Sequence, residues 1–416
     1  MRNRIGQDSL KTSKGIQTMS LFSAVEQAAA DPILGLNEEF AADPRADKVN
    51  LGVGVCLDET GRLPLLRCIR AAEQQLAIEP APRGYLPIDG LASYDTDVRR
   101  LVFGSRSALL AADRVVTLQA LGGTGALKLG ADFLARIDPA ARVLISAPSW
   151  ENHRGLFARA GFEVAEYRYY DPAARGIDFA GMCADLAAAP AGTIVVLHAC
   201  CHNPTGYDLD ADQWDRVIEI CRAGNLVCFF DMAYQGFAQG TDQDAAVVRR
   251  AAERVPNLLV SSSFSKTFGL YGERVGALSV LCETADVAAR VRSQLKIVIR
   301  TNYSNPPTHG ARLVATVFAD EGLRADWIAE LGEMRDRIKQ MRIALLAGLQ
   351  AAGVDDMGFV TEQLGMFSYT GLTAGQMQRL RSEFGIYGTD AGRICVAALN
   401  TRNVDRVAAS IAAVRS

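Results

Sequence analysis

The sequence predicts an α/β protein, with a large domain built on a mostly parallel sheet and a smaller α+β domain. Its 416 residues exceed what one ordinary hydrophobic core accommodates, so more than one unit is expected. Between residues 114 and 281, short apolar runs alternate with helical patterns. Strands that are buried on both faces are continuous apolar runs, and this alternation is typical of a parallel sheet covered by helices.

The chain begins with a polar segment that differs from the rest. Residues 1–18 carry several basic side chains and lack the apolar core of a secretory signal. We expect this segment to be a disordered extension, with a transit peptide as the alternative. An amphipathic pattern begins at Met19, and residues 19–60 are expected to pack with the small domain.

Residues 61–320 are predicted to form the large domain. Its strands are expected in apolar runs, and helices are expected between them, for example at residues 126–136 and 211–222. The strand-like runs are residues 115–118, 143–146, 193–197, 226–230, 258–260 and 277–281.

Residues 321–416 are predicted to form the small domain. Apolar side chains recur at helical spacing over residues 324–351, which predicts one long amphipathic helix. Two short strand-like pieces follow at residues 366–369 and 394–396, and a terminal helix begins at Val404. This mixture of helices and short strands indicates an α+β unit.

Composition and charge exclude several classes of protein. Apolar residues make up 49% of the chain and charged residues 22%, which is typical of a globular protein. The net charge of −3 argues against a nucleic-acid interface, which needs a concentrated basic face. No apolar run approaches the roughly 18 residues of a membrane helix, so no membrane span is expected.

Cysteine and histidine usage gives no metal pattern. Nine cysteines are scattered without a C-x-x-C pair, several of them in apolar runs. This indicates buried thiols in a reduced, cytoplasmic protein and argues against disulfides or zinc. His198 and His202 have the i, i+4 spacing of a metal pair on a helix, but their segment is predicted to run from strand to turn. We therefore expect no metal site and assign both histidines a structural role.

The most informative segment is residues 261–276, which places Lys266 among hydroxyl groups and follows it with Arg274. A lysine amine can form a Schiff base, and the hydroxyls of Ser263 and Ser265 with an arginine can hold a phosphate. A cofactor with an aldehyde and a phosphate, such as pyridoxal 5′-phosphate (PLP), needs both. An ordinary polar loop is the alternative interpretation.

A second phosphate-binding candidate is the small-residue turn at residues 122–126, which includes Gly123 and Thr124. It follows a predicted strand and opens a helix, so its backbone N–H groups would lie at the positive end of the helix dipole. The segment matches neither a P-loop nor the dinucleotide-binding fingerprint. A simple strand-to-helix turn is the alternative.

Asp231 ends an apolar run at the carboxyl end of a predicted parallel strand, where ligands of open α/β sheets bind. A carboxylate in apolar surroundings costs free energy unless it is paired. A protonated pyridine nitrogen would be such a partner, and Tyr234 could reach the phenolic oxygen of the same ring. The alternative for Asp231 is a helix N-cap.

Three further polar residues are candidates for ligand binding. Asn203 precedes Pro204, which favours an extended backbone and lets the amide face a ligand oxygen. The guanidinium groups of Arg393 and Arg300 could bind carboxylates through two hydrogen bonds. A solvated surface position is the alternative for each arginine.

Together these residues resemble the class I PLP-dependent aminotransferases, in particular the bacterial aspartate and aromatic (tyrosine) amino acid aminotransferases. The similarity extends from about Leu21 to the C-terminus. It implies the PLP-dependent transferase type I fold, with residues 61–320 as the PLP-binding domain, and a homodimer with its active sites at the subunit interface. The motifs that carry the resemblance are residues 31–34, 200–206, 231–237, 263–276, 302–307 and 365–368.

The resemblance implies a role for each cofactor-binding candidate. Lys266 is similar to the Schiff-base lysine and Asp231 to the partner of the pyridine nitrogen, and both are catalytic candidates together with Tyr234. Tyr234 and Asn203 would contact the phenolic oxygen. The phosphate-binding residues would be Gly123, Thr124, Ser263, Ser265 and Arg274.

The resemblance also implies how substrate is bound. Trp150 would stack on the cofactor ring, and Arg393 would bind the substrate α-carboxylate with Gly54 closing over it. Tyr85 and Arg300 would act across the dimer interface, Tyr85 on the partner's phosphate and Arg300 on the side-chain carboxylate of a dicarboxylic substrate. Trp150, Asn203 and Gly54 are therefore expected at the substrate as well.

The activity implied is transfer of the amino group of aromatic amino acids (tyrosine, phenylalanine) and/or aspartate to 2-oxoglutarate by a ping-pong mechanism. Residues 150–153 and 366–370 favour the aromatic-accepting branch. One departure is Cys56, where many relatives carry tyrosine, and it bears on the shape of the substrate mouth. A strict aspartate aminotransferase, a lyase or decarboxylase on this fold, and a non-catalytic ligand-sensing module are the alternatives.

The mechanism makes a prediction about the pKa of Lys266. An amine that moves a proton near neutral pH works best with a depressed pKa. Burial and the neighbouring cations Arg274 and Arg393 would lower it.

Overall fold

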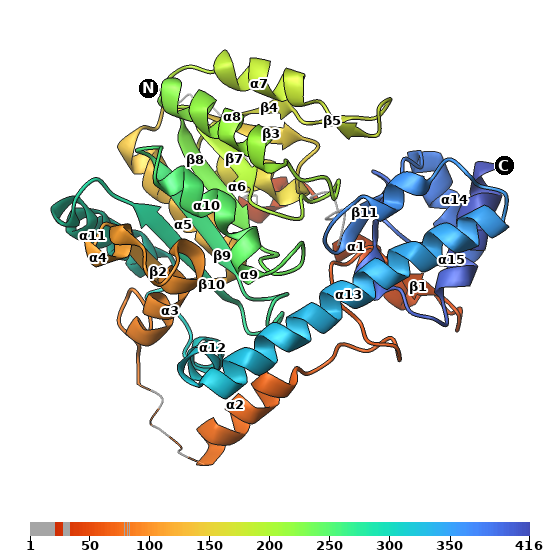
Figure 1. The fold of residues 1–416 in the computed structure, drawn as a ribbon, viewed down its shortest axis with the longest axis horizontal. Coiled ribbons are helices and arrows are strands. Elements are labelled where there is room, and N and C mark those ends of the chain that lie inside the picture. Colours follow the sequence, from red (N-terminus) through yellow and green to blue (C-terminus); the bar gives the residue numbers. More distant parts are fainter. Residues whose placement is uncertain (1–20, 28–33, 79, 81, 83) are drawn as a thin grey trace, which may run out of the picture.

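The structure is a computed structural model that describes residues 21–27, 34–78, 80, 82 and 84–416. The predicted extension at residues 1–18 and most of the motif at residues 31–34 lie outside the described residues. The described chain forms a larger α/β body and a smaller body near the C-terminus, and the long helix α13 (Glu321–Ala351) runs from one to the other (Figure 1).

A seven-stranded sheet forms the centre of the larger body. The strand β10 is antiparallel to both of its neighbours, β2 and β9, and the other adjacent pairs are parallel. The prediction of a mostly parallel sheet is therefore confirmed, and all six predicted strands are present. In spatial order the strands are β2 (Val115–Leu121), β10 (Val275–Leu281), β9 (Leu258–Ser263), β8 (Val227–Met232), β7 (Ile194–His198), β3 (Arg142–Ala147) and β4 (Glu163–Arg168).

The seventh strand, β4, was not predicted. It lies at the edge of the sheet, and of its side chains only that of Tyr167 is buried. An edge strand with exposed polar residues has no continuous apolar run, which is the signal that revealed the six others.

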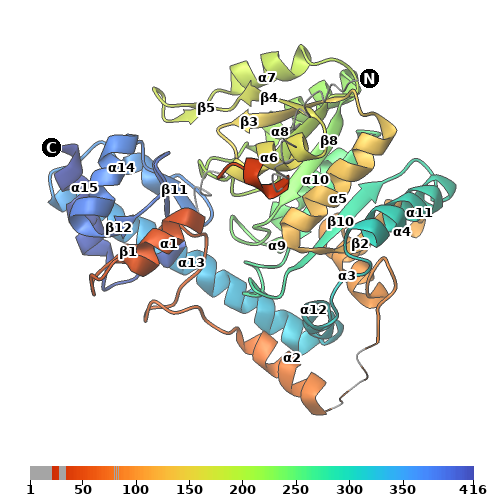
Figure 2. The same ribbon diagram turned by 180° about the vertical axis from the view of Figure 1, so that it is seen from behind.

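Helices cover both faces of the sheet (Figures 1 and 2). Successive side chains of a strand point to opposite faces, and Phe229 and Phe230 of β8 accordingly belong to two different apolar clusters. The cluster of Phe229 includes residues of α5 (Gly122–Ile137), α6 (Glu151–Arg159) and α11 (Ala285–Asn302). The cluster of Phe230 includes residues of α3 (Ala92–Phe103), α7 (Phe179–Ala187), α8 (Ala211–Ala223), α10 (Ala246–Ala252) and α12 (His309–Ala319).

The remaining elements of the larger body are short or peripheral. They are α2 (Arg67–Ile78), α4 (Ala108–Ala111), β5 (Tyr170–Asp171), β6 (Gly176–Ile177) and α9 (Thr241–Asp244).

The smaller body contains two pairs of very short strands. The strand β11 (Phe367–Tyr369) pairs antiparallel with β13 (Arg393–Cys395), and β1 (Val49–Asn50) pairs parallel with β12 (Ile386–Tyr387). The other elements at this end of the chain are η2 (Gly358–Thr361), α14 (Ala374–Phe384), η3 (Val396–Ala398) and α15 (Val404–Arg415), and those of the N-terminal segment are η1 (Leu21–Ala24) and α1 (Leu34–Ala42).

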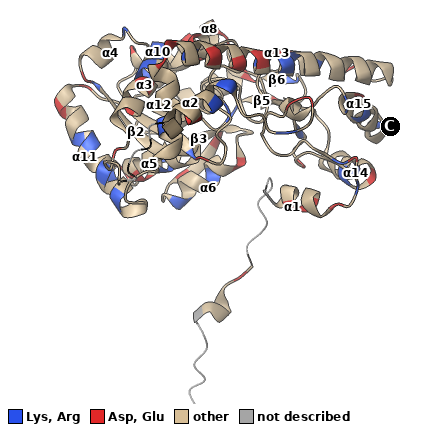
Figure 3. Ribbon diagram, turned by 90° about the horizontal axis from the view of Figure 1, so that it is seen from below, with Lys and Arg blue, Asp and Glu red and all other residues tan. Residues whose placement is uncertain are grey.

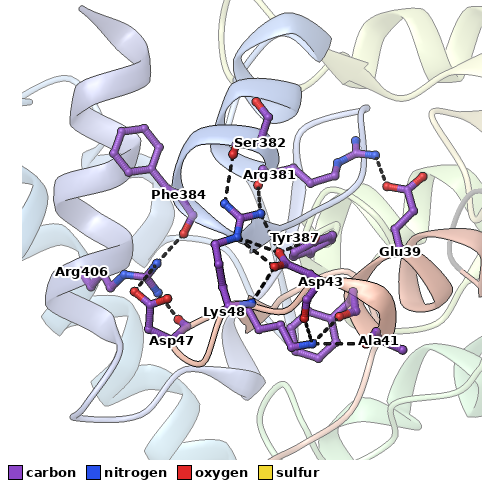
Figure 4. Close-up of polar contacts among 12 residues, drawn as sticks. Glu39, Ala41, Asp43, Asp47, Lys48, Arg381, Ser382, Phe384, Tyr387 and Arg406 are labelled. Atoms are coloured by element: carbon purple, nitrogen blue, oxygen red, sulfur yellow. Dashed lines mark hydrogen bonds and ion pairs between the residues drawn. The ribbon is translucent and has the colours of Figure 1, made fainter.

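Side-chain contacts connect the N-terminal segment to the smaller body (Figure 4). Asp43 pairs with Arg45 and accepts a hydrogen bond from Tyr387 Oη at 2.7 Å, and these groups hold the pKa of Asp43 well below its usual range. Arg45 also donates to the carbonyl of Arg381 at 2.9 Å. Arg406 of α15 donates to the carbonyls of Asp47 and Phe384. The exact domain boundaries stay a prediction.

The outer surface carries both signs of charge. Figure 3 shows acidic and basic residues interspersed along the outer helices, so the electric field around them is mixed in sign. Among the described residues, no helix combines the length and the apolar character that a bilayer crossing requires.

Candidate active site

A cavity of about 620 Å³ lies between the larger and the smaller body. It is lined by residues at the carboxyl ends of β8 and β9, by the start of α5, and by residues of β11 and β13. All of the predicted site residues except Tyr85 and Arg300 line this cavity. They are Gly54, Gly123, Thr124, Trp150, Asn203, Asp231, Tyr234, Ser263, Ser265, Lys266, Arg274 and Arg393.

Lys266 lies just beyond the end of β9, with its Nζ 5.2 Å from the centre of the Tyr234 ring. Burial lowers the pKa of Lys266 to about 8, and the positive charges of Arg274 and Arg393 act in the same direction while Asp231 opposes them. The predicted depression of this pKa and its causes are confirmed. At pH 8 about half of the amine is therefore neutral and able to accept a proton.

Asp231 lies within β8, which excludes the interpretation as a helix N-cap. Its Oδ2 is 3.0 Å from Nε2 of His153, and His153 Nδ1 is 2.8 Å from Ser149 Oγ. Burial favours the neutral carboxyl, but the hydrogen bond with His153 and the positive charge of Lys266 outweigh it, and the pKa of Asp231 lies below its ordinary value. The carboxylate therefore stays ionised inside the protein.

His153 contacts Asp231, and the sequence did not predict this contact. It lies in the first turn of α6, three residues after Trp150, and its ring is edge-on to the Trp150 ring with the centroids 5.2 Å apart. That i, i+3 spacing was the only local signal for it. Its contact with Asp231, which is 78 residues away, appears only once the chain is folded.

The start of α5 has room for an anion. Gly122 has a positive φ of 68°, and a Cβ there would come within 2.6 Å of Arg274 Nη2. A Cβ at Gly123 would lie 3.0 Å from the Cβ of Ser263. Arg274 Nη1 donates to Ser265 Oγ at 3.2 Å. Glycines thus allow a guanidinium and two hydroxyls to gather at a helix N-terminus that has no acidic residue in its first turn.

Arg393 forms the opposite side of the cavity. It is 1% exposed, its Nη1 donates to Asn203 Oδ1 at 2.9 Å, and its Nη2 donates to the carbonyl of Gly52 at 2.8 Å. Its Nε is buried without a hydrogen-bond partner among the described residues. Because both of these acceptors are neutral, they do not compensate the positive charge of the guanidinium, which can therefore pair with a ligand anion.

Both histidines near Asn203 are buried in hydrogen-bonded positions. His198 Nδ1 accepts from the Asn203 backbone N–H at 3.2 Å, and the His202 ring contacts Ser146 Oγ at 2.9 Å and Thr205 Oγ1 at 2.8 Å. Burial, reinforced by His153, lowers the pKa of His198 to about 3. These neutral rings hold the turn that carries Asn203.

Three residues that the sequence singled out, Tyr85, Arg300 and Cys56, do not line the cavity. Tyr85 is 96% exposed, and Arg300 is an exposed residue of α11 that donates to Ser304. Within one chain both are surface residues, and their action across an interface stays a prediction. Cys56 is buried behind the lining, where its N–H donates to Tyr271 Oη at 3.0 Å and burial raises its pKa to about 12. Tyr271 lines the cavity and Cys56 does not, and the effect of Cys56 on the shape of the mouth stays a prediction.

A family model described as aminotransferase class I and II matches residues 46–411. The chain belongs to this family. The resemblance drawn from the motifs is confirmed, and with it the PLP-dependent transferase fold.

Relatives of this aminotransferase carry two kinds of name. It is 60% identical over 394 residues to the aspartate aminotransferase of Pseudomonas aeruginosa, covering 94% of this chain and 99% of that protein. It is 51% identical over 396 residues to the aromatic-amino-acid aminotransferase of Escherichia coli, covering 95% of this chain and 100% of that protein. A crystal structure of the aromatic-amino-acid aminotransferase of Burkholderia pseudomallei, covalently bound to pyridoxal phosphate, has 62% identity and a TM-score of 0.93, covering 96% of this chain and 100% of that one.

Proposed function

We propose that this aminotransferase uses PLP to move the amino group of aromatic amino acids and aspartate to 2-oxoglutarate by a ping-pong mechanism. The observation that supports this most directly is the meeting of three groups in one cavity. These are an amine with a pKa of about 8, an ionised carboxylate and a buried guanidinium, contributed by Lys266, Asp231 and Arg393.

The residues around the cavity fit PLP. The start of α5 with Ser263, Ser265 and Arg274 offers the donors and positive charge that a phosphate needs, and two glycines keep the space open. Asp231 offers an ionised acceptor for a protonated pyridine nitrogen. Bound there, the cofactor would supply an electron sink for the negative charge that develops on the substrate α-carbon.

Lys266 supplies the amine chemistry. Its Nζ would hold the cofactor covalently in the resting enzyme, and the Burkholderia relative is likewise covalently bound to pyridoxal phosphate. Once the substrate amine has displaced it from the cofactor, Nζ would remove the proton from the substrate α-carbon. It would then deliver a proton to the cofactor carbon to which it had been attached. A pKa of about 8 suits both steps, because the neutral and protonated forms are both populated near neutral pH.

The remaining residues bind and orient. His153 fixes one oxygen of Asp231 and helps to keep it ionised. Burial raises the pKa of Tyr234, so its hydroxyl stays a hydrogen-bond donor. Arg393 would bind the substrate α-carboxylate, and its bonds to Asn203 and Gly52 set the direction of the guanidinium.

A homodimer in the cytoplasm is part of the proposal. Exposed Tyr85 and Arg300 would then serve the partner's site, with Arg300 reading a side-chain carboxylate. A strict aspartate aminotransferase is the second candidate, favoured by the name of the 60% identical relative.

A panel of amino donors against 2-oxoglutarate tests the proposal. Tyrosine, phenylalanine and aspartate are each expected to yield their 2-oxo acid and glutamate, with the parallel double-reciprocal lines of a ping-pong mechanism. Activity with aspartate alone would establish the strict alternative. Release of carbon dioxide without formation of glutamate would refute transamination and indicate a decarboxylase.

A further inference from the structure

Arg342 of α13 is a buried arginine that the proposed mechanism does not use. It is 2% exposed, and no carboxylate of the described residues is within hydrogen-bond distance of it. A buried guanidinium costs free energy unless other acceptors satisfy its N–H groups. Burial lowers the pKa of Arg342 to about 10. The positions of its hydrogen-bond acceptors therefore show which part of the molecule this buried cation stabilises.

All four acceptors lie in one segment, residues 360–368. Nη1 donates to the carbonyl of Val360 at 3.0 Å and to Ser368 Oγ at 2.5 Å. Nη2 donates to the carbonyls of Gly365 at 2.9 Å and Phe367 at 2.6 Å. Only the ends of this segment belong to η2 and β11, so little regular structure holds it. Together with the bond from the Leu364 N–H to the carbonyl of Gly206 at 2.6 Å and the pairing of β11 with β13, Arg342 thus holds the main chain on both sides of the Phe367 side chain.

The Phe367 ring is in direct contact with the proposed carboxylate-binding group. Its centre is 4.3 Å from Cζ of Arg393, and it lies edge-on to the Tyr234 ring at 6.0 Å. A Cβ at Gly54 would lie only 2.6 Å from Cζ of this ring. Because the ring is enclosed on these sides, a shift of its main chain would move the surface on which the Arg393 guanidinium lies.

We infer that Arg342 is a positioning residue for carboxylate binding. By holding residues 360–368, it keeps the Phe367 ring against Arg393 and so fixes where Arg393 meets the substrate carboxylate. The inference rests on the proposed function, because it takes Arg393 as the carboxylate-binding residue. It assigns Arg342 an effect on substrate affinity, which differs from a general contribution to stability.

The test uses the holoenzyme with Arg342→Lys, which keeps the positive charge but cannot reach four acceptors at once. The dissociation constant of 3-phenylpropionate, the phenylalanine skeleton without its amine, is measured by calorimetry, and KM and kcat are measured for phenylalanine. The dissociation constant and KM are expected to rise about tenfold, which corresponds to the loss of one charged hydrogen bond. The value of kcat is expected to change less than about threefold. A folded variant whose dissociation constant stays within about twofold of wild type overturns the inference.

Arg406→Lys is the matched control, because it makes the same substitution at another arginine. Arg406 also binds two main-chain carbonyls of the smaller body, and none of its partners lines the cavity (Figure 4). It is expected to lower Tm without changing the dissociation constant of 3-phenylpropionate. If it raises that constant as much as Arg342→Lys does, the effect is structural and the inference is wrong.

A double-mutant cycle with Phe367→Leu tests the route of action. If Arg342 acts through the ring, the double variant is expected to bind 3-phenylpropionate no more weakly than Phe367→Leu alone, and additive losses would contradict this. Should Arg342→Lys fail to fold, Ser368→Ala removes one acceptor and is expected to raise the constant about threefold; no rise would again refute the inference. Failure of the wild type to bind 3-phenylpropionate or to transaminate would instead refute the proposed function.

Discussion

The side of the cavity that carries Lys266 and Asp231 belongs to a seven-stranded sheet, whereas the side that carries Arg393 belongs to a pair of three-residue strands. In the sheet, the backbone ladder between β8 and its neighbours β7 and β9 positions Asp231, and the end of β9 positions the turn with Lys266. At Arg393 the ladder is short, and hydrogen bonds of side chains provide most of the positioning. Asn203 accepts from Arg393 itself, and Arg342 donates to the carbonyl of Phe367.

The two sides of the cavity are therefore expected to respond differently to mutation. Groups fixed by a large sheet keep their place when a neighbouring side chain changes, so mutation there removes chemistry. Groups fixed by side-chain hydrogen bonds lose their geometry when one partner changes, so mutation there weakens binding. The helix α13 contacts both sides, since Trp327 Nε1 donates to the carbonyl of Thr267 at 2.8 Å and Arg342 binds the segment before β11.

The largest effect is expected from Lys266→Ala, on the sheet side. The variant loses the amine that moves the proton, and kcat should fall more than about 10³-fold. The Tm of the apoenzyme, in which this amine is free, should not fall, because the depressed pKa means that the charged amine is unfavourable in the folded protein below pH 8. Near wild-type transamination without added amine would show that another group does the chemistry.

Asp231→Asn should have the next largest effect. It removes the ionised partner of the ring nitrogen while leaving the fold of β8 intact, and kcat should fall about 10²- to 10³-fold. The surface variant Asp215→Asn on α8 is the control and should leave kcat unchanged. A fall in substrate affinity with kcat intact would place Asp231 in substrate binding instead.

Arg393→Lys probes the other side of the cavity. A lysine keeps the charge but loses the planar fork of the guanidinium. For phenylalanine and for aspartate, kcat/KM should therefore fall about 10- to 10²-fold, mostly because KM rises. Equal losses in kcat and kcat/KM would mean that both sides of the cavity act on the chemical step, which would break the contrast between them.

The smallest effect is a pH dependence of cofactor attachment. The neutral amine of Lys266 is the nucleophile, and its pKa is about 8 rather than the ordinary 10.5. The attachment rate in the apoenzyme, followed by absorbance, should therefore rise about tenfold from pH 7 and level off above pH 8 to 9. A rate that keeps rising to pH 10 would show an ordinary lysine.

The sequence predicted the sheet side of the cavity better than the other. Asp231 and Lys266 follow apolar runs, so local pattern places them at strand ends. The edge strand β4 has no such run, and the role of His153 depends on a contact across 78 residues. Arg342 was part of an amphipathic helix pattern, and nothing local indicates that its guanidinium binds three carbonyls and a hydroxyl 18 to 26 residues later. Contacts of that kind are set by tertiary packing.

The proposed function depends above all on Lys266 Nζ being the amine that binds the cofactor. The most direct measurement is borohydride reduction of the holoenzyme, followed by digestion and mass mapping of the modified peptide. The account predicts that the added pyridoxyl phosphate mass lies on the peptide that contains Lys266, and that Lys266→Ala abolishes it. Stoichiometric modification of another lysine, or none in an active holoenzyme, would contradict the account.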